Sequence, residues 1–195
     1  MNMPKRKFDE QRVASLVIQH DDEPMNPREW DNLGKMACWH RRYTFGDIQP
    51  KEDSREWVKE NVPKGSVVLP VFMMDHSGLT VSTSSASFRA CDSAKGDWGQ
   101  LGIIFATPEA IRKSFMVKRV TKKLKEKVEA ILRSEVETYD LYLTGQCWGY
   151  VTTDAEGEED SCWGFLGDTL ENTGLKEALP DAAIPLLEAA WAART

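Results

Sequence analysis

The chain has 195 residues, of which 41% are hydrophobic, and a formal net charge of −6. It contains no apolar run near the roughly 18 residues of a membrane span, and four cysteines are too few for a disulfide scaffold. The opening MNMPKRKFDE is charged without an apolar stretch behind it, so we expect no signal peptide, a cytoplasmic protein, free thiols and no membrane contact.

Charge is segregated along the sequence. Residues 111–127 hold eight Lys and Arg against one Glu, whereas residues 128–195 hold fourteen Asp and Glu against three basic residues. Such a basic segment indicates contact with nucleic acid or an acidic protein, an internal match to the acidic half of the chain, or simply a surface that keeps the protein in solution.

Short β-type runs separated by turn signals occupy the first half of the chain. A strand is predicted at 12–20, a second at 35–44, and a hairpin in which Val67–Met74 pairs with Leu79–Thr83 across Ser77-Gly78. The polar segment 85–99 predicts a surface loop, and GQLGIIFA (99–106) a further strand.

Three helices are predicted after these strands. Thr107-Pro108-Glu109 has the residue types of a helix start, with an end near Val117. Apolar residues of helical spacing predict a long helix over about 121–144, which stops at Gly145. The segment DAAIPLLEAAWAA predicts a short C-terminal helix.

Together these elements predict an α+β fold in a single domain, residues 1–195, built around one core, with residues 1–10 as a flexible arm. We expect a mostly antiparallel sheet of about six or seven strands, with the 121–144 helix packed on one face.

The stretch CWGYVTTDAEGEEDSCWGF (147–165) predicts another hairpin. A two-residue turn at Glu156-Gly157 places Tyr150 opposite Trp163, Trp148 opposite Phe165 and Val151 opposite Cys162, so that four rings share a face. Cys147 and Cys162 then lie roughly 13 Å apart, too far for a disulfide. The glycines at 149 and 164 indicate a bulge or the close approach of another chain.

Two interpretations of this hairpin remain open. The rings pack beneath the long helix and the acidic tip is solvated, or rings and tip together form a partner-binding surface. The residues of that surface are Trp148, Tyr150, Glu156, Glu158, Glu159, Trp163 and Phe165.

Two basic clusters are candidate sites for a phosphate, a carboxylate or nucleic acid. They are His40, Arg41 and Arg42, and Lys118, Arg119, Lys122 and Lys123. Cys38 and His40 would share a strand face, but no second Cys/His pair with suitable spacing exists, so we predict no metal site and no cofactor.

An enzymatic alternative uses residues 75–98. Asp75 and His76 follow a predicted strand, and Cys91 and Asp92 lie in the loop, which suits a hydrolase with Cys91 as nucleophile and His76 and Asp92 as its partners. The glycine-rich phosphate-binding patterns GxxxxGK[ST] and GxGxxG are absent.

Four stretches carry a resemblance to known proteins: DNLGKMACWHRRYTFGD, PVFMMDHSGLTVS, ACDSAKGDWGQLGIIF, and YDLYLTGQCWGYV with DSCWGF. Over about residues 28–167 the chain resembles a group of small, mostly uncharacterised orphan proteins encoded by bacteriophages and prophages. The resemblance implies a viral accessory protein in the bacterial host cytoplasm, of the kind that includes anti-defence and anti-CRISPR inhibitors, and carries no catalytic residues.

The function expected first is therefore a binding protein that modulates a host protein or nucleoprotein complex. A Cys/His hydrolase or nucleotide-processing enzyme using residues 75–98 is the alternative, and a nucleic-acid binder using residues 112–127 is the second alternative.

Overall fold

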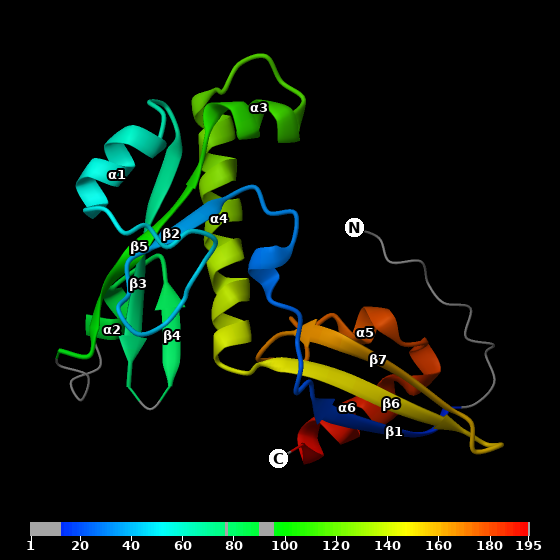
Figure 1. Ribbon diagram of the computed structural model, residues 1–195. Helices are drawn as coiled ribbons and strands as arrows, with labels where there is room; N and C mark the ends of the chain where they lie inside the picture. The colour runs from blue at the N-terminus through cyan, green and yellow to red at the C-terminus, as the bar shows by residue number, and fades with distance from the viewer. Residues whose placement is uncertain (1–12, 77, 90–95, 195) are drawn as a thin grey trace. The chain divides into compact units, whose positions relative to one another are not determined.

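A computed structural model of the protein describes residues 13–76, 78–89 and 96–194 (Figure 1). The chain divides into two compact units: unit 1, from residues 1–25 and 145–195, and unit 2, residues 26–144. Each unit holds its own cluster of buried hydrophobic residues, where the sequence had suggested one core. The boundaries of the predicted single domain stay a prediction, and its arm at residues 1–10 lies outside the described residues.

Unit 2 contains a four-stranded antiparallel sheet with strand order β2-β5-β3-β4. The predicted hairpin is confirmed as β3 and β4, with Met73 opposite Val81. The strand predicted over 35–44 ends at Cys38. The elements of unit 2 are η1 (Pro27–Glu29), β2 (Lys35–Cys38), α1 (Ser54–Asn61), β3 (Val67–Asp75), β4 (Leu79–Ser82), α2 (Ala86–Arg89), β5 (Trp98–Ala106), α3 (Pro108–Phe115) and α4 (Lys122–Leu143).

The long helix α4 begins and ends where the sequence predicted. The Thr121 hydroxyl accepts the backbone N–H of Leu124 at 3.3 Å and caps the first turn. The buried face of the helix consists of Val128, Leu132, Val136 and Tyr139, which recur every three or four residues. Helix α4 contacts β3, β4 and β5, so the prediction of a long helix packed on a sheet is confirmed.

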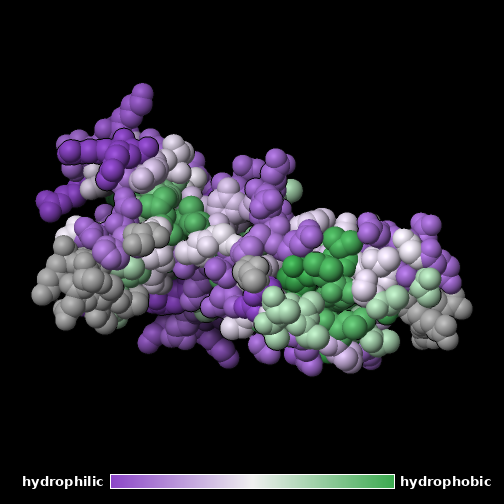
Figure 2. Space-filling view, turned by 90° about the horizontal axis from the view of Figure 1, so that it is seen from below, coloured by the Kyte–Doolittle hydropathy of each residue, from purple (hydrophilic) through white to green (hydrophobic). Residues whose placement is uncertain are grey.

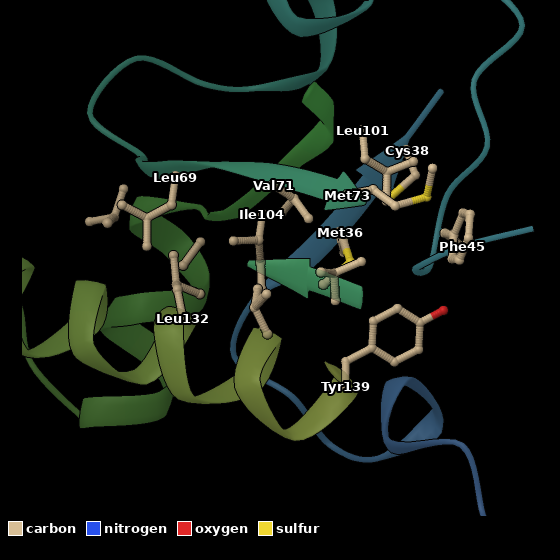
Figure 3. Close-up of a cluster of buried hydrophobic side chains, with 14 of the residues drawn as sticks. Met36, Cys38, Phe45, Leu69, Val71, Met73, Leu101, Ile104, Leu132 and Tyr139 are labelled. Atoms are coloured by element: carbon tan, nitrogen blue, oxygen red, sulfur yellow. The ribbon is translucent and has the colours of Figure 1, made fainter. Parts of the chain in front are cut away.

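The core of unit 2 forms between this helix and the sheet (Figure 3). Leu132 extends from α4 toward Leu69 and Ile104 on β3 and β5, whereas Tyr139, farther along the helix, lies beside Met36 and Phe45. These residues are 0–8% exposed, and burying each large apolar side chain contributes about 1.5–3 kcal/mol to stability.

A buried arginine links the chain before β2 to α4. The Arg28 side chain is 2% exposed and donates to Asp47 at 2.7 Å, to Glu135 at 3.2 Å and to the Gly34 carbonyl at 2.8 Å. Glu135 also accepts the backbone N–H groups of Leu33 and Gly34. Burial by itself lowers the pKa of Arg28, but the hydrogen bonds and charges of the two carboxylates outweigh it, and the pKa is raised.

Unit 1 contains a three-stranded antiparallel sheet of order β1-β6-β7. The predicted strand at 12–20 and the C-terminal helix are present, with Pro185 in the first turn of that helix. Its elements are β1 (Val13–His20), β6 (Cys147–Asp154), β7 (Glu159–Leu166), α5 (Leu175–Ala178), η3 (Asp181–Ala183) and α6 (Ile184–Ala193). Figure 2 shows hydrophobic side chains gathered on the face of unit 1 that carries α6 and β1.

The fold class is α+β, as predicted, but the seven strands of the described residues form two sheets in place of one. None of the helices within the described residues combines the length and the apolar character that crossing a membrane requires.

The Arg28 network generates a stability prediction. Arg28→Ala leaves Asp47 and Glu135, whose side chains are each only 11% exposed, without their cation, so we expect a loss of about 3–5 kcal/mol in the free energy of unfolding. Urea unfolding followed by circular dichroism measures this loss. Arg133→Ala on the exposed side of α4 is the control, with an expected loss below about 1 kcal/mol. Equal losses for the two variants would contradict the role of the network.

A second prediction concerns Asp140 of α4, whose Oδ1 accepts the Thr80 hydroxyl at 2.7 Å and the Val81 N–H at 2.6 Å. Burial raises the pKa of Asp140, so the folded state favours the protonated acid and its ionisation costs stability as pH rises through the raised pKa. Asp140→Asn keeps the acceptor oxygen and should be more stable than the wild type at pH about 7, with no difference below about pH 4.

The matched variant Asp140→Ala removes the acceptor altogether. It should lose about 1–3 kcal/mol at both pH values, because the Val81 N–H and the Thr80 hydroxyl lose their partner. Thermal unfolding of the three proteins at the two pH values checks both expectations. If Asp140→Asn is less stable than the wild type at neutral pH, the expectation for the asparagine variant is wrong.

Candidate functional site

The 147–165 hairpin is present as β6 and β7, but its register differs from the prediction. Trp148 faces Phe165 as expected, whereas Tyr150 faces Cys162 and Val151 faces Ser161. The turn is longer than two residues because the Asp154 carboxylate accepts the N–H groups of Glu156 and Glu158. Next to the turn, each residue of β6 therefore faces the residue of β7 one position before the predicted partner. A bulge at Gly164, which has φ 90°, brings Trp148 back opposite Phe165, as predicted.

Three of the four hairpin rings belong to the core of unit 1. Trp148, Tyr150 and Phe165 are 3–8% exposed, and the Trp148 indole donates to the Gly167 carbonyl at 2.8 Å. The Trp191 ring packs against Trp148 with a centroid distance of 5.1 Å. Because they are buried in the folded unit 1, these three side chains are not available to a partner.

Trp163 is the exception, and the prediction that all four rings share one face is wrong for it. Its side chain is 43% exposed and covers Gly149, where an added Cβ would lie 2.0 Å from the ring. Gly149 lies between Trp148 and Tyr150, and neighbouring strand residues point to opposite faces, so Trp163 covers the outer face. The exposed part of the predicted partner surface is Trp163 with Glu156, Glu158 and Glu159, and its role stays a prediction.

The contact between Trp163 and Gly149 can be tested by a double-mutant cycle. Gly149→Ala forces the indole off the strand and should cost about 1–3 kcal/mol in stability, with a red shift of the tryptophan emission. Trp163→Ala removes the obstacle, so the cost of adding the alanine should largely vanish in the double variant. Additive costs would show that the alanine clashes with something else.

The thiols of the described cysteines are free, as predicted, and two are buried. Burial raises the pKa of Cys38 to about 12 and that of Cys147 to about 11, which suits neither as a nucleophile. Cys91 and Asp92, which the hydrolase alternative proposed as catalytic residues, lie outside the described residues. Among the residues that the structure does describe, no three His, Cys, Asp or Glu side chains are grouped as metal ligands would be.

A hollow with several ionisable residues in its walls lies at one end of the four-stranded sheet, and we call it the sheet-end cleft. It has a volume of about 340 Å³, a size that suits a small ligand. Three segments of the chain line it: the loop after β2, the end of β3, and the start of β5 with the two residues before it. Its principal lining residues are Trp39, His40, Arg42, Asp75, Asp97, Trp98 and Gln100.

The cleft brings together residues from two candidate sites that are separate in the sequence. Arg42, from the basic cluster after β2, lies 3.8 Å from the carboxylate of Asp75, from the proposed enzymatic region. Both side chains are well exposed, so this ion pair is weak and Arg42 is available to an anionic ligand. His40 also lines the cleft, whereas Arg41 beside it does not.

The loop after β2 is held in place by local hydrogen bonds. His40 Nδ1 accepts the backbone N–H groups of Arg42 and Tyr43 at 3.3 and 3.0 Å, which assigns the proton of the neutral ring to Nε2. The His40 ring stacks on Tyr43. The Trp39 indole donates to the Glu52 carbonyl at 3.0 Å and packs edge-on against Trp57 of α1.

A histidine–carboxylate pair lies at the same end of the sheet. His76 Nδ1 is 3.0 Å from Asp97 Oδ2, and the backbone of Asp75 donates to the Asp97 carbonyl at 2.9 Å. When Asp97 accepts Nδ1–H, His76 Nε2 is a free base that a carboxylate orients. His76 and Asp75 were named as candidates from the sequence, whereas Asp97 and Trp98 were included only within the range 75–98, and Trp39 and Gln100 were not named, because none of these four belongs to a recognisable motif.

A second hollow of about 370 Å³ adjoins the cleft, since Trp39, Gln100 and Leu101 line both. Its far wall is α1, through Ser54, Arg55 and Val58. The sequence contained a start signal for α1 in Asp53, whose side chain caps the first turn, but this helix was not predicted.

Comparisons with protein-family models, curated protein sequences and solved structures found no match to this chain.

Proposed function

We propose that the protein binds a nucleotide-like ligand, a planar ring joined to an anionic group, in the sheet-end cleft. The observation that supports this most is the convergence of a guanidinium, two carboxylates and two indoles on one hollow from three separate segments. Indole faces stack on planar heterocycles, and a guanidinium binds phosphate oxygens better than other side chains.

The remaining polar groups suit the rest of such a ligand. Asp75 and Asp97 accept hydrogen bonds from sugar hydroxyls or ring amino groups, and the Gln100 amide both donates and accepts. The adjoining hollow beside α1 gives the ligand room beyond the cleft itself. This mode of binding needs no glycine-rich phosphate loop, which the sequence does not contain.

Adenosine monophosphate, adenosine and inorganic phosphate are the probes that test the proposal, with binding followed through the emission of Trp39 and Trp98. We expect the nucleotide to bind more tightly than either of its parts. Arg42→Ala should weaken nucleotide binding about 10-fold or more, because a charge-assisted hydrogen bond is lost. Arg41→Ala, the neighbouring arginine outside the cleft, is the control and should change binding less than about 2-fold.

Two outcomes would overturn the proposal. One is the absence of saturable binding for every probe. The other is equal weakening by the Arg41 and Arg42 substitutions, which would reflect general charge and not the cleft.

The His76–Asp97 pair favours a second candidate function, hydrolysis of the bound ligand. This is the nucleotide-processing enzyme that the sequence suggested as an alternative. His76 does not itself line the cleft but pairs with Asp97, which does, so the candidate requires the phosphate to extend toward His76. His76 Nε2 would then take a proton from a water that attacks the phosphorus atom, and the ester oxygen would leave with a proton from solvent. Phosphate release that His76→Asn abolishes while nucleotide binding persists supports this candidate. Loss of release in Cys91→Ala would instead point to the cysteine nucleophile.

A further inference from the structure

The corner between α3 and α4 carries a cationic surface that the cleft does not use. We call it the basic corner, and Figure 1 shows α3, the connecting loop and the start of α4 together at one end of unit 2. It consists of six exposed side chains: Arg112, Lys113, Lys118, Arg119, Lys122 and Lys123. None of the six forms an ion pair with any residue that the structure describes.

The negative net charge of the whole chain does not reflect the charge of unit 2, to which this surface belongs. Unit 2 holds nineteen Lys and Arg against sixteen Asp and Glu, a net charge of +3, whereas unit 1 holds six against fifteen, a net charge of −9. The acidic pI therefore reflects unit 1. Within residues 111–127 the only acid is Glu126, and Lys122 and Lys123 lie in the first turn of α4, where the helix dipole disfavours cations.

The apex of the corner is an exposed methionine in an unusual backbone conformation. Met116 ends α3 with φ 53° and ψ 42°, and its N–H donates to the carbonyls of Arg112 and Lys113. This left-handed conformation favours glycine, so a methionine there is a local cost. The Met116 side chain is 92% exposed and Val117 follows it at 37%, so packing within the unit does not explain an apolar residue at this position.

We propose that the basic corner docks on nucleic acid, with its six cations on the phosphate backbone and Met116 against sugar or base surfaces in a groove. Nucleic acid fits because the cations follow one another along a continuous stretch without interleaved acids. With all six cations on phosphates, which carry no sequence information, the contact should be independent of sequence. This inference does not rest on the nucleotide proposal for the cleft.

The test measures the fluorescence anisotropy of two labelled DNA duplexes of unrelated sequence, at several salt concentrations. We expect equal affinities for the two duplexes. If the six cations each neutralise a phosphate, the log–log slope of affinity against salt should be about −5. Absence of binding to both duplexes at low salt would overturn the proposal, and so would a clear preference for one of them.

Charge-matched variants separate the corner from the overall charge. Lys118/Lys122/Lys123→Glu should abolish duplex binding at low salt. Lys51/Lys59/Lys64→Glu makes the same change in net charge at exposed lysines elsewhere in unit 2 and should leave most of the binding intact. Equal loss in both variants would show that the corner is not the site. Tighter binding of a polyglutamate peptide than of DNA would reassign the surface to an acidic protein.

The role of Met116 in the contact is tested separately, by substitutions that change its side chain. Met116→Gly should leave Tm unchanged or higher, since glycine adopts the left-handed conformation without strain and no packing is lost. The same variant should bind the duplexes several-fold more weakly, whereas Met116→Leu should retain the affinity. A fall in Tm for the glycine variant, or unchanged binding, would remove Met116 from the proposed contact.

Discussion

The buried charge network of Arg28, Asp47 and Glu135 is the constraint on which unit 2 depends. It connects the segment before β2, the loop after it and the middle of α4, which are far apart in sequence. Asp47 also accepts the Met36 N–H at 2.6 Å, so the network fixes the start of β2 as well as its own partners. Buried charges of this kind are tolerated only when they are paired and hydrogen-bonded, and within the described residues every buried side-chain nitrogen or oxygen atom has a hydrogen-bond partner.

The position of the sheet-end cleft follows from this constraint. The chain between β2 and Asp47 is a loop, and its two ends are tied to the sheet and to Arg28. Trp39, His40 and Arg42 lie in that loop and reach the ends of β3 and β5. The cleft is thus a set of polar and aromatic side chains at strand ends and in the adjoining loops, which an apolar core holds in position, an arrangement common to binding sites.

The two units divide the electrostatics of the chain. The acidic residues of the β6–β7 tip belong to unit 1, and the basic corner belongs to unit 2. The tryptophans also have different roles in the two units: Trp148 belongs to the core of unit 1 and Trp191 packs against that core, whereas Trp39 and Trp98 line the cleft of unit 2. The seven tryptophans of the chain therefore have no single role, because some are buried and others lie at the surface.

The sequence by itself determined the local elements: α4 with its cap at Thr121, the β3–β4 hairpin, and the helix start at Thr107. Hydrophobic period, capping residues and turn residues are properties of short stretches, so they can be read without the fold. The tertiary structure alone decided the register around Gly164, the burial of Trp148, Tyr150 and Phe165, and the meeting of Arg42 with Asp75. Each of these depends on which segments pack together across long sequence separations, and no local pattern carries that information.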